Sequence, residues 1–387
     1  MKMILITNAH LYTPTDRLNP AWLIIENNHI HSLGEGKPTE LPPGSDAQVI
    51  DARGGHLLPG FIDIHVHGAM GHELMDSTPE GLHQMARFYA QHGVTSFLPS
   101  TWAAPHSQTW RALEMVSKLI GPVDNGATIL GVHMEGPYLN AAKCGAQDPA
   151  AIRRADPPEA RAYLDTGIVR YMSLAPEFPE NHWLIEECVR RGIAVALGHT
   201  EATYDQVKEA VRRGVRSVTH TFNAMTGLSH RQPGTVGAAL TIPELSCELI
   251  ADNIHIHPAV MKLLVNAKTP AGVTLITDAM RGAGLPDGDY QIDQRKVTVR
   301  DGTVRLPDGT LAGSTLTIDR ALCNILSATG RPLDEIWPMT SWNAARLLGL
   351  DTKGSLEPGK DADMVLLDTE FKVAKTIVGG KTIQHGQ

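Results

Sequence analysis

Short apolar runs recur along the middle of the chain, and stretches with the spacing of amphipathic helices separate them. The apolar runs cover residues 61–67, 95–99, 129–135, 169–177, 193–199, 217–222, 247–252 and 273–278. The helical stretches include residues 79–91, 107–119, 183–191, 204–213 and 258–265. Near-continuous apolar strands are typical of a parallel sheet that is buried on both faces. Eight strand-then-helix units therefore predict an α/β fold of the (β/α)8 type, a TIM-like barrel.

An open, doubly wound sheet is the alternative arrangement of such units. That fold usually carries a GxGxxG turn directly after its first strand. No such turn follows residues 61–67, so the barrel is the prediction that we carry forward.

The two ends of the chain differ from the middle and resemble each other. Short strand-like runs at 3–6, 22–26 and 29–33, and again at 362–367 and 375–378, are separated by Asn, Pro and Gly turns. Neither end has enough apolar residues for a core of its own. We therefore expect residues 1–56 and 354–387 to pair into one small β-sandwich domain, with the barrel (57–353) inserted between them.

Metal-capable side chains stand at the ends of five of the predicted barrel strands. They are His65 and His67, Glu135, His199, His220, and Asp278. Residues two apart in a strand point to the same side, so His65 and His67 can face one point. The carboxyl ends of barrel strands converge on one mouth, where barrel enzymes keep their active sites. Core packing explains such a set poorly, and the sequence predicts a metal centre.

Imidazole and carboxylate ligands suit zinc, iron and related divalent metals. An open coordination position lets the metal hold a water and lower its pKa toward about 7, and the hydroxide can attack a carbonyl. Asp278 is the candidate acid/base that takes a proton from the water and gives it to the leaving amine. No GxSxG nucleophile motif competes, and Cys144 has no obvious paired base.

His133 lies two residues before Glu135, so a strand points both side chains to the same side. Two interpretations remain open. The imidazole either orients a metal ligand or packs inside the barrel.

Composition limits the partners of this chain. The hydrophobic share of 42% and the charged share of 20% are those of an ordinary soluble globular protein. The net charge of -8 argues against nucleic acid as a partner. The N-terminal apolar run is too short for a signal peptide, and no stretch is long enough to span a bilayer. The scattered cysteines Cys144, Cys188, Cys247 and Cys323 suit a reducing compartment, so we expect a cytoplasmic protein.

Longer motifs around the strand ends resemble the amidohydrolase superfamily. The general signs are PGFIDIHVH at 59–67 and GSLEPGKDAD at 354–363. Narrower signs are HMEGPYLN at 133–140, GHTEAT at 198–203, THTFNAM at 219–225, ADNIH at 251–255, TDA at 277–279 and LAGS at 311–314. In their order and spacing they resemble the family of N-acetylglucosamine-6-phosphate deacetylases within that superfamily.

This resemblance implies a metal-dependent hydrolase that removes the acetyl group from N-acetylglucosamine-6-phosphate, with Asp278 as acid/base. Glu135, His199 and His220 match the main metal ligands of the family. His65 and His67, which some members lack, imply room for a second ion, with Glu135 bridging the two. One or two divalent ions per chain are expected, zinc first, with iron, manganese and cobalt as alternatives.

The resemblance also implies residues that contact substrate. Arg231 and His255 match positions at the sugar phosphate, and guanidinium suits phosphate because it can bond two oxygens at once. Positions at the sugar and its acetamide are Ala146, Gln147, Asn223, Ala224, Leu311, Ala312 and Gly313. Gln147 stands where some members have histidine; it can donate a hydrogen bond but cannot carry a proton in the same way. Related enzymes are often dimers, so we expect a homodimer.

Two other functions compete with this one. The first is hydrolysis of another substrate, such as N-acetylgalactosamine-6-phosphate or an N-acyl amino acid, because the residues do not fix the stereochemistry at one sugar carbon. The second is a non-catalytic binding protein on a hydrolase fold. Such a protein is expected to have lost ligands or Asp278, and this chain retains all of them.

Overall fold

Eight parallel strands form the barrel in the computed structural model, which describes residues 3–38, 47–293 and 295–384. They are β6 (Phe61–Val66), β9 (Val94–Pro99), β11 (Val132–Glu135), β12 (Val169–Leu174), β13 (Ala194–Leu197), β14 (Ser217–Val218), β15 (Ser246–Ile250) and β16 (Val273–Ile276). The Asp278 amide donates to the His65 carbonyl at 2.9 Å, which joins the ends of β16 and β6. Each predicted apolar run overlaps one of these strands, with β9 and β15 beginning one residue earlier than predicted, and the predicted α/β barrel is confirmed.

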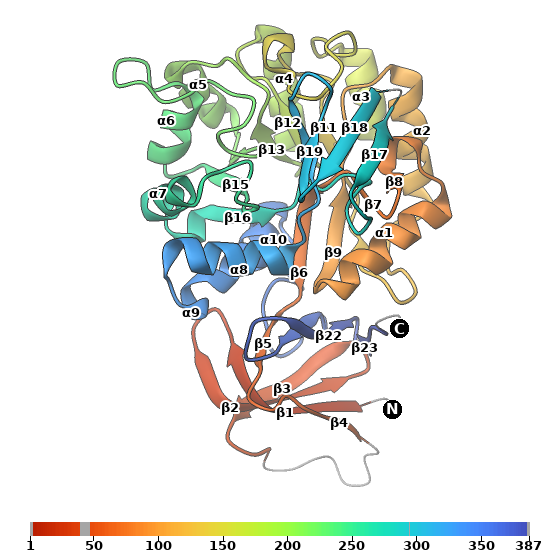
Figure 1. Cartoon of the computed structure of the whole chain (residues 1–387), viewed down its shortest axis with the longest axis vertical. Helices are drawn as coiled ribbons and strands as arrows, with labels where there is room; N and C mark the ends of the chain where they lie inside the picture. The colour runs from red at the N-terminus through yellow and green to blue at the C-terminus, as the bar shows by residue number, and fades with distance from the viewer. Residues whose placement is uncertain (1–2, 39–46, 294, 385–387) are drawn as a thin grey trace.

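Helices surround this sheet on its outer side (Figure 1). They are α1 (Pro79–Gln91), α2 (His106–Ser117), α3 (Pro157–Asp165), α4 (Pro179–Arg190), α5 (Tyr204–Arg213), α6 (Gly234–Thr241), α7 (Pro258–Lys268), α8 (Ile318–Thr329), α9 (Leu333–Ile336) and α10 (Trp342–Leu348). Helix α5 begins at a capping box of Thr203 and Gln206 and ends at Gly214, whose φ is 115°. These local signals explain why α5 has the bounds that the sequence predicts. Among the described residues, every helix is too short or too polar to cross a membrane.

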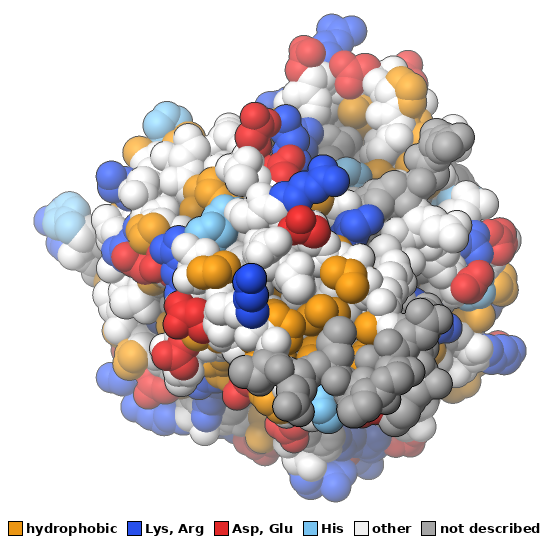
Figure 2. Space-filling model, turned by 90° about the horizontal axis from the view of Figure 1, so that it is seen from below, with side chains coloured by type: hydrophobic (Ala, Val, Ile, Leu, Met, Phe, Trp, Pro, Cys, Tyr) orange, Lys and Arg blue, Asp and Glu red, His pale blue; other side chains and the backbone are white. Residues whose placement is uncertain are grey.

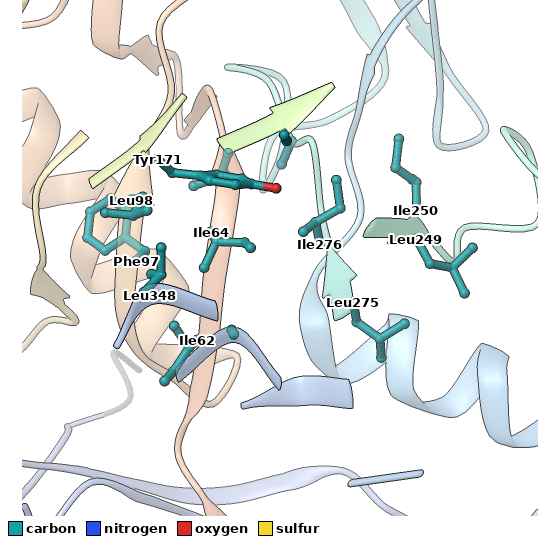
Figure 3. Close-up of a cluster of buried hydrophobic side chains, with 14 of the residues drawn as sticks. Ile62, Ile64, Phe97, Leu98, Tyr171, Leu249, Ile250, Leu275, Ile276 and Leu348 are labelled. Carbon is teal, nitrogen blue, oxygen red and sulfur yellow. The ribbon is translucent and has the colours of Figure 1, made fainter. Parts of the chain in front are cut away.

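The core inside the barrel is built from the apolar runs (Figure 3). Figure 3 labels Ile62 and Ile64 from β6 and Ile276 from β16 within this cluster, and all three side chains are at most 1% exposed. Burying one such side chain contributes about 1.5–3 kcal/mol. The strands therefore need apolar residues along their length, and polar residues collect where the strands end.

The two chain ends form one sheet below the barrel in Figure 1. Its strands are β1 (Met3–Tyr12), β2 (Arg17–Glu26), β3 (His29–Glu35), β4 (Ala47–Asp51), β5 (His56–Pro59), β21 (Met364–Leu367), β22 (Val373–Val378) and β23 (Lys381–Thr382). Antiparallel pairing of β5 with β21 joins the N-terminal and C-terminal segments, which confirms that the ends pair. The domain limits at 57 and 353 stay a prediction; β5 crosses the first of them.

Charged side chains of both signs are interspersed over the end of the molecule that carries this sheet (Figure 2). Mixed charges of this kind produce no extended field of one sign.

A small antiparallel sheet follows β16 and was missed by the sequence analysis. It consists of β17 (Gly288–Ile292), β18 (Arg295–Arg300), β19 (Thr303–Arg305) and β20 (Leu311–Ser314). Polar residues dominate these strands, so no apolar run marks them. The sheet stands at the end of the barrel away from the terminal sheet (Figure 1), and a short hairpin of β7 (Gly68–Ala69) and β8 (His72–Glu73) follows β6.

Candidate active site

Two groups of metal-capable side chains lie at the carboxyl ends of the barrel strands. One consists of His65, His67 and Asp278, and the other of Glu135, His199 and His220. Within each group the ligand atoms lie within 4.8 Å of one another, and all the side chains are buried. The structure therefore brings together every residue that the sequence placed at a metal centre.

Turns at the strand ends aim three of these side chains inward. His199, His220 and Asp278 have φ angles of 47°, 28° and 49°, in the left-handed region that non-glycine residues seldom adopt. Such a conformation costs on the order of 1–3 kcal/mol and is typical of functional sites. Backbone hydrogen bonds offset this cost, and the Asp278 amide donor described above is one of them.

Glu135 lies between the two groups. Its Oε1 atom is 3.1 Å from Nε2 of His199 and 2.9 Å from Nε2 of His220. Its Oε2 atom is 3.4 Å from Nε2 of His67. The same Nε2 atom of His67 lies 3.2 Å from Oδ1 of Asp278. One carboxylate thus contacts imidazoles of both groups, the placement that a bridging ligand requires.

In two of the histidines, Nδ1 is held by an oxygen and Nε2 is directed toward the other metal-capable side chains. Nδ1 of His65 lies 3.0 Å from a Glu248 carboxylate oxygen, and Nδ1 of His199 lies 2.7 Å from the Lys143 carbonyl. These oxygens can only accept, so both Nδ1 atoms carry the proton. The Nε2 atom of His65 is buried without a hydrogen-bond partner among the described residues. Metal-binding histidines show this arrangement, and both groups fit a divalent metal ion.

The close approach of imidazoles and carboxylates shifts the pKa values of both. Burial alone would lower the pKa of His65, but the carboxylates of Glu135, Glu248 and Asp278 raise it to about 9. Burial would raise the pKa of the Glu135 and Asp278 carboxyls, but the neighbouring imidazoles lower both below their ordinary range. The carboxylates are therefore ionised near neutral pH, the state in which they bind a metal or accept a proton.

His133 is part of a neutral network inside the barrel. Its Nδ1 lies 2.9 Å from the Ser100 hydroxyl and its Nε2 lies 2.7 Å from the Ser173 hydroxyl. Burial lowers the pKa of His133 well below its usual value, with the charge of His65 adding to the effect. Its ring packs edge-on against His65 at 4.4 Å between centroids. These contacts favour the packing interpretation.

A cavity of about 420 Å³ opens beside the two groups. Its wall includes His67, Glu135, His199, His220 and Asp278. It also includes eight of the nine residues predicted to contact substrate: Ala146, Gln147, Asn223, Ala224, His255, Leu311, Ala312 and Gly313. The ninth, Arg231, is exposed and lies outside this wall.

Gln147 is held against the bridging carboxylate. Its Nε2 donates to Oε2 of Glu135 at 2.7 Å, and its Oε1 accepts from the Ala103 amide at 2.6 Å. The amide group therefore presents its NH2 end toward the metal-capable groups.

Strand β20 forms the wall next to Asp278. The Ser314 amide donates to the Asp278 carbonyl at 2.8 Å. Gly313 has a φ of 69°, and a Cβ atom there would lie 2.9 Å from the same carbonyl oxygen. Only glycine lets the strand approach this closely.

Three functional candidates were missed by the sequence analysis. Arg295 and Arg305 line the cavity and come from the small sheet, whose strands were not recognised. Arg295 donates to the Ala146 carbonyl, and Arg305 donates to the Gly309 carbonyl at 2.6 Å. Glu248 could have been found, because it is a charged residue inside an otherwise apolar run.

Comparison with known proteins places the chain in one family. The profile of the Amidohydrolase family matches residues 56–383. An N-acetylglucosamine-6-phosphate deacetylase of Vibrio furnissii is 40% identical over 84% of this chain and 82% of the relative. An N-acetylgalactosamine-6-phosphate deacetylase of Escherichia coli O157:H7 is 39% identical over 84% of this chain and 87% of the relative.

A solved structure agrees with these sequence matches. A variant N-acetyl-D-glucosamine-6-phosphate deacetylase from Mycobacterium smegmatis, in complex with N-acetyl-D-glucosamine-6-phosphate, superimposes with a TM-score of 0.92. It is 30% identical, and the match covers 100% of both chains. Sequence and structure together show that the chain belongs to the amidohydrolase family, in the group of the N-acetylglucosamine-6-phosphate deacetylases.

Proposed function

We propose that this protein is a metal-dependent deacetylase that hydrolyses N-acetylglucosamine-6-phosphate to glucosamine-6-phosphate and acetate. One observation carries the proposal: a single cavity brings the metal-capable groups against eight residues predicted to contact the sugar and its acetamide. The names of the relatives, and the ligand in the Mycobacterium smegmatis complex, support this substrate.

The metal-binding role is assigned to both groups. Glu135, His199 and His220 would hold one divalent ion, and His65, His67 and Asp278 would hold a second. When bound, an ion supplies Lewis-acid activation of water and of the acetyl carbonyl. Zinc is the first choice because imidazole and carboxylate are its common ligands, and iron, manganese and cobalt are the alternatives.

Asp278 moves the proton in this proposal. Its ionised carboxylate faces the cavity and accepts a proton from the attacking water as the new carbon–oxygen bond forms. The same proton then passes to the nitrogen of the acetamide as the carbon–nitrogen bond breaks. An amine is a poor leaving group unless it is protonated, so this transfer allows the products to separate.

The sugar end of the substrate is assigned to the outer part of the cavity. Oδ2 of Asp252 accepts from Nδ1 of His255 at 2.7 Å, which fixes the ring with its Nε2 edge available to a ligand. Asn223, Ala224 and the segment 311–313 form neighbouring wall. We assign His255 to the phosphate and the other residues to the sugar and its acetamide.

We assign Arg231 to the phosphate site of a second copy of the chain. It is exposed and lies outside the cavity wall of its own chain, so the structure describes no contact between Arg231 and the phosphate site proposed in that chain. A homodimer in which this loop reaches the neighbouring cavity accounts for both properties. Arg295 and Arg305, which line the cavity of their own chain, are the competing phosphate-binding residues.

The cysteines support the assignment to a reducing compartment. Cys144, Cys188, Cys247 and Cys323 are all free. A reducing cytoplasm keeps such thiols free, and we propose that location for this protein.

A panel of substrates tests the proposed reaction. Acetate release is measured with N-acetylglucosamine-6-phosphate, its galacto and manno counterparts, unphosphorylated N-acetylglucosamine and N-acyl amino acids. The expected result is the highest kcat/KM for the gluco phosphate. The identity to the Escherichia coli O157:H7 relative makes the galacto phosphate the second candidate. Binding without acetate release from any compound would instead indicate a non-catalytic protein.

A further inference from the structure

Glu248 is a buried carboxylate that none of the assigned functions uses. It lies on β15, and its side chain is 0% exposed. Oε2 lies 3.0 Å from Nδ1 of His65 and accepts the backbone N–H of His220 at 2.9 Å. A single oxygen atom therefore contacts one member of each metal-capable group.

Packing alone does not explain a carboxylate at this position. Taking an ionised group out of water costs several kcal/mol unless its oxygens are well paired. The second oxygen, Oε1, is buried without a hydrogen-bond partner among the residues that the structure describes. An apolar side chain would fill the same space without this cost, so the contacts of Oε2 are the feature that needs an explanation.

The two contacts act on different atoms. At His65, the carboxylate holds the proton on Nδ1 and leaves the unpartnered Nε2 toward Asp278 and Glu135. At His220, it binds the backbone N–H of a residue in the left-handed conformation, with a φ of 28°. The side chain of that residue contacts Glu135. The contact with Nδ1 sets the direction in which His65 presents Nε2. The contact with the backbone N–H stabilises the turn that carries His220.

We propose that Glu248 is a positioning residue that orients His65 for a second metal ion and ties this site to the ligand His220 of the first. Carboxylate partners of this kind fix the tautomer of a metal-binding histidine and raise its basicity. This inference rests on the proposed function in one respect, because it requires that both groups bind metal ions. It does not depend on which acyl compound is the substrate.

The chain offers a matched control at the end of the same strand. Asp252 accepts from Nδ1 of His255 at 2.7 Å and is also buried from most solvent, with its side chain 6% exposed. Its histidine belongs to neither metal-capable group. A carboxylate–histidine pair is thus present in both places, but only one faces the metal sites.

The experiment measures metal content and metal affinity in the full-length protein. Parent, Glu248→Gln, Glu248→Ala and Asp252→Asn are loaded with zinc and dialysed against chelators of graded strength, and bound zinc per chain is determined by elemental analysis. Thermal unfolding of the metal-free proteins is recorded in parallel. Gln keeps the shape and an oxygen acceptor but removes the charge, whereas Ala removes both contacts.

The parent and Asp252→Asn should each retain two ions with equal affinity. Glu248→Gln should weaken one of the two sites about tenfold, and Glu248→Ala should weaken that site about a hundredfold, the range seen for outer partners of metal ligands. Glu248→Ala should also weaken the other site, because the N–H of His220 loses its acceptor. A purely structural role would lower the unfolding temperature but leave the zinc affinity of the folded protein unchanged.

Two results would overturn the inference. If Glu248→Gln and Glu248→Ala hold two ions as tightly as the parent, Glu248 does not position the ligands, and the proposed function stands. If the parent binds a single ion, the site around His65 does not exist as assigned and the inference fails with it. A parent that binds no zinc or other divalent ion but still releases acetate would overturn the metal-dependent function itself.

Discussion

Histidines gather at two places in this molecule, the mouth of the barrel and the junction between the barrel and the terminal sheet. At the mouth, His65 and His67 lie 5.3 Å apart between ring centroids. At the junction, His10 and His56 stack at 5.2 Å, and the Tyr12 hydroxyl lies 2.8 Å from Nδ1 of His56. The two pairs have nearly the same spacing but different surroundings.

Their surroundings move the pKa values in opposite directions. Carboxylates that face His65 overcome the effect of burial and raise its pKa to about 9. Burial, with the charges of His10 and Arg17 adding to it, lowers the pKa of His56 to about 4. Two close histidines are therefore insufficient for a metal site; the carboxylates that face them distinguish the mouth from the junction.

The largest expected effect comes from a ligand at the mouth. His199→Ala should lose bound metal and nearly all acetate release, because Glu135 and His220 alone form an incomplete site. His56→Gln at the junction should keep the metal content and kcat of the parent. Elemental analysis and steady-state kinetics measure both, and normal metal content in His199→Ala would contradict the assignment.

The second effect separates proton transfer from metal binding. Asp278→Asn keeps the shape of the side chain but cannot accept the proton. It should lower kcat by roughly 10²- to 10⁴-fold, the range for a positioned acid or base, with much less change in KM. Turnover within a few-fold of the parent, in a variant that retains its metal, would show that another group moves the proton.

The third effect compares the two metal-capable groups. His65→Ala should remove one of two ions and leave the ion held by Glu135, His199 and His220. Activity should survive in part if one ion suffices for the reaction. Bound metal per chain, measured together with kcat, checks this, and loss of both ions would mean that the groups form a single site.

The fourth effect concerns the phosphate. Arg231→Ala should raise KM strongly for N-acetylglucosamine-6-phosphate and change it little for the unphosphorylated sugar, which makes no phosphate contact. Arg305→Ala is the matched variant inside the cavity. A selective rise in KM for Arg305→Ala alone would move the phosphate site to the small sheet, and equal losses on both sugars would make either residue structural.

The smallest effect is on stability at the junction. The folded-state pKa of His56, about 4, lies below its ordinary value of 6.5, so the unfolded chain binds more protons between these values. Its contribution to the free energy of unfolding is therefore present above pH 6.5 and decreases as the pH falls toward about 4. Urea unfolding at several pH values should show a shallower decrease for His56→Gln. An identical pH dependence in both proteins would show that His56 does not titrate in this range.

Much of the fold and of the metal centre could be read from the order of residues, because the signals are local. Apolar runs require burial on both faces, and caps such as Thr203 and Gln206 begin a helix within a few residues. The spacing of His65 and His67 puts both imidazoles on one side of a strand. Parallel strands in a barrel bring Glu135, His199, His220 and Asp278 to the same mouth.

Contacts between distant segments could not be read in this way. Glu248 meets His65 across 183 positions of sequence, and Arg295 reaches the Ala146 carbonyl from a sheet without apolar runs. Arg231 follows a barrel strand end like the ligands, yet it lies outside the cavity. A strand's residue pattern encodes which face is buried, but the partner of a buried polar group depends on the closure of the barrel and the path of its loops. The position of the metal centre therefore follows from local pattern, whereas the groups that orient its ligands follow from tertiary packing.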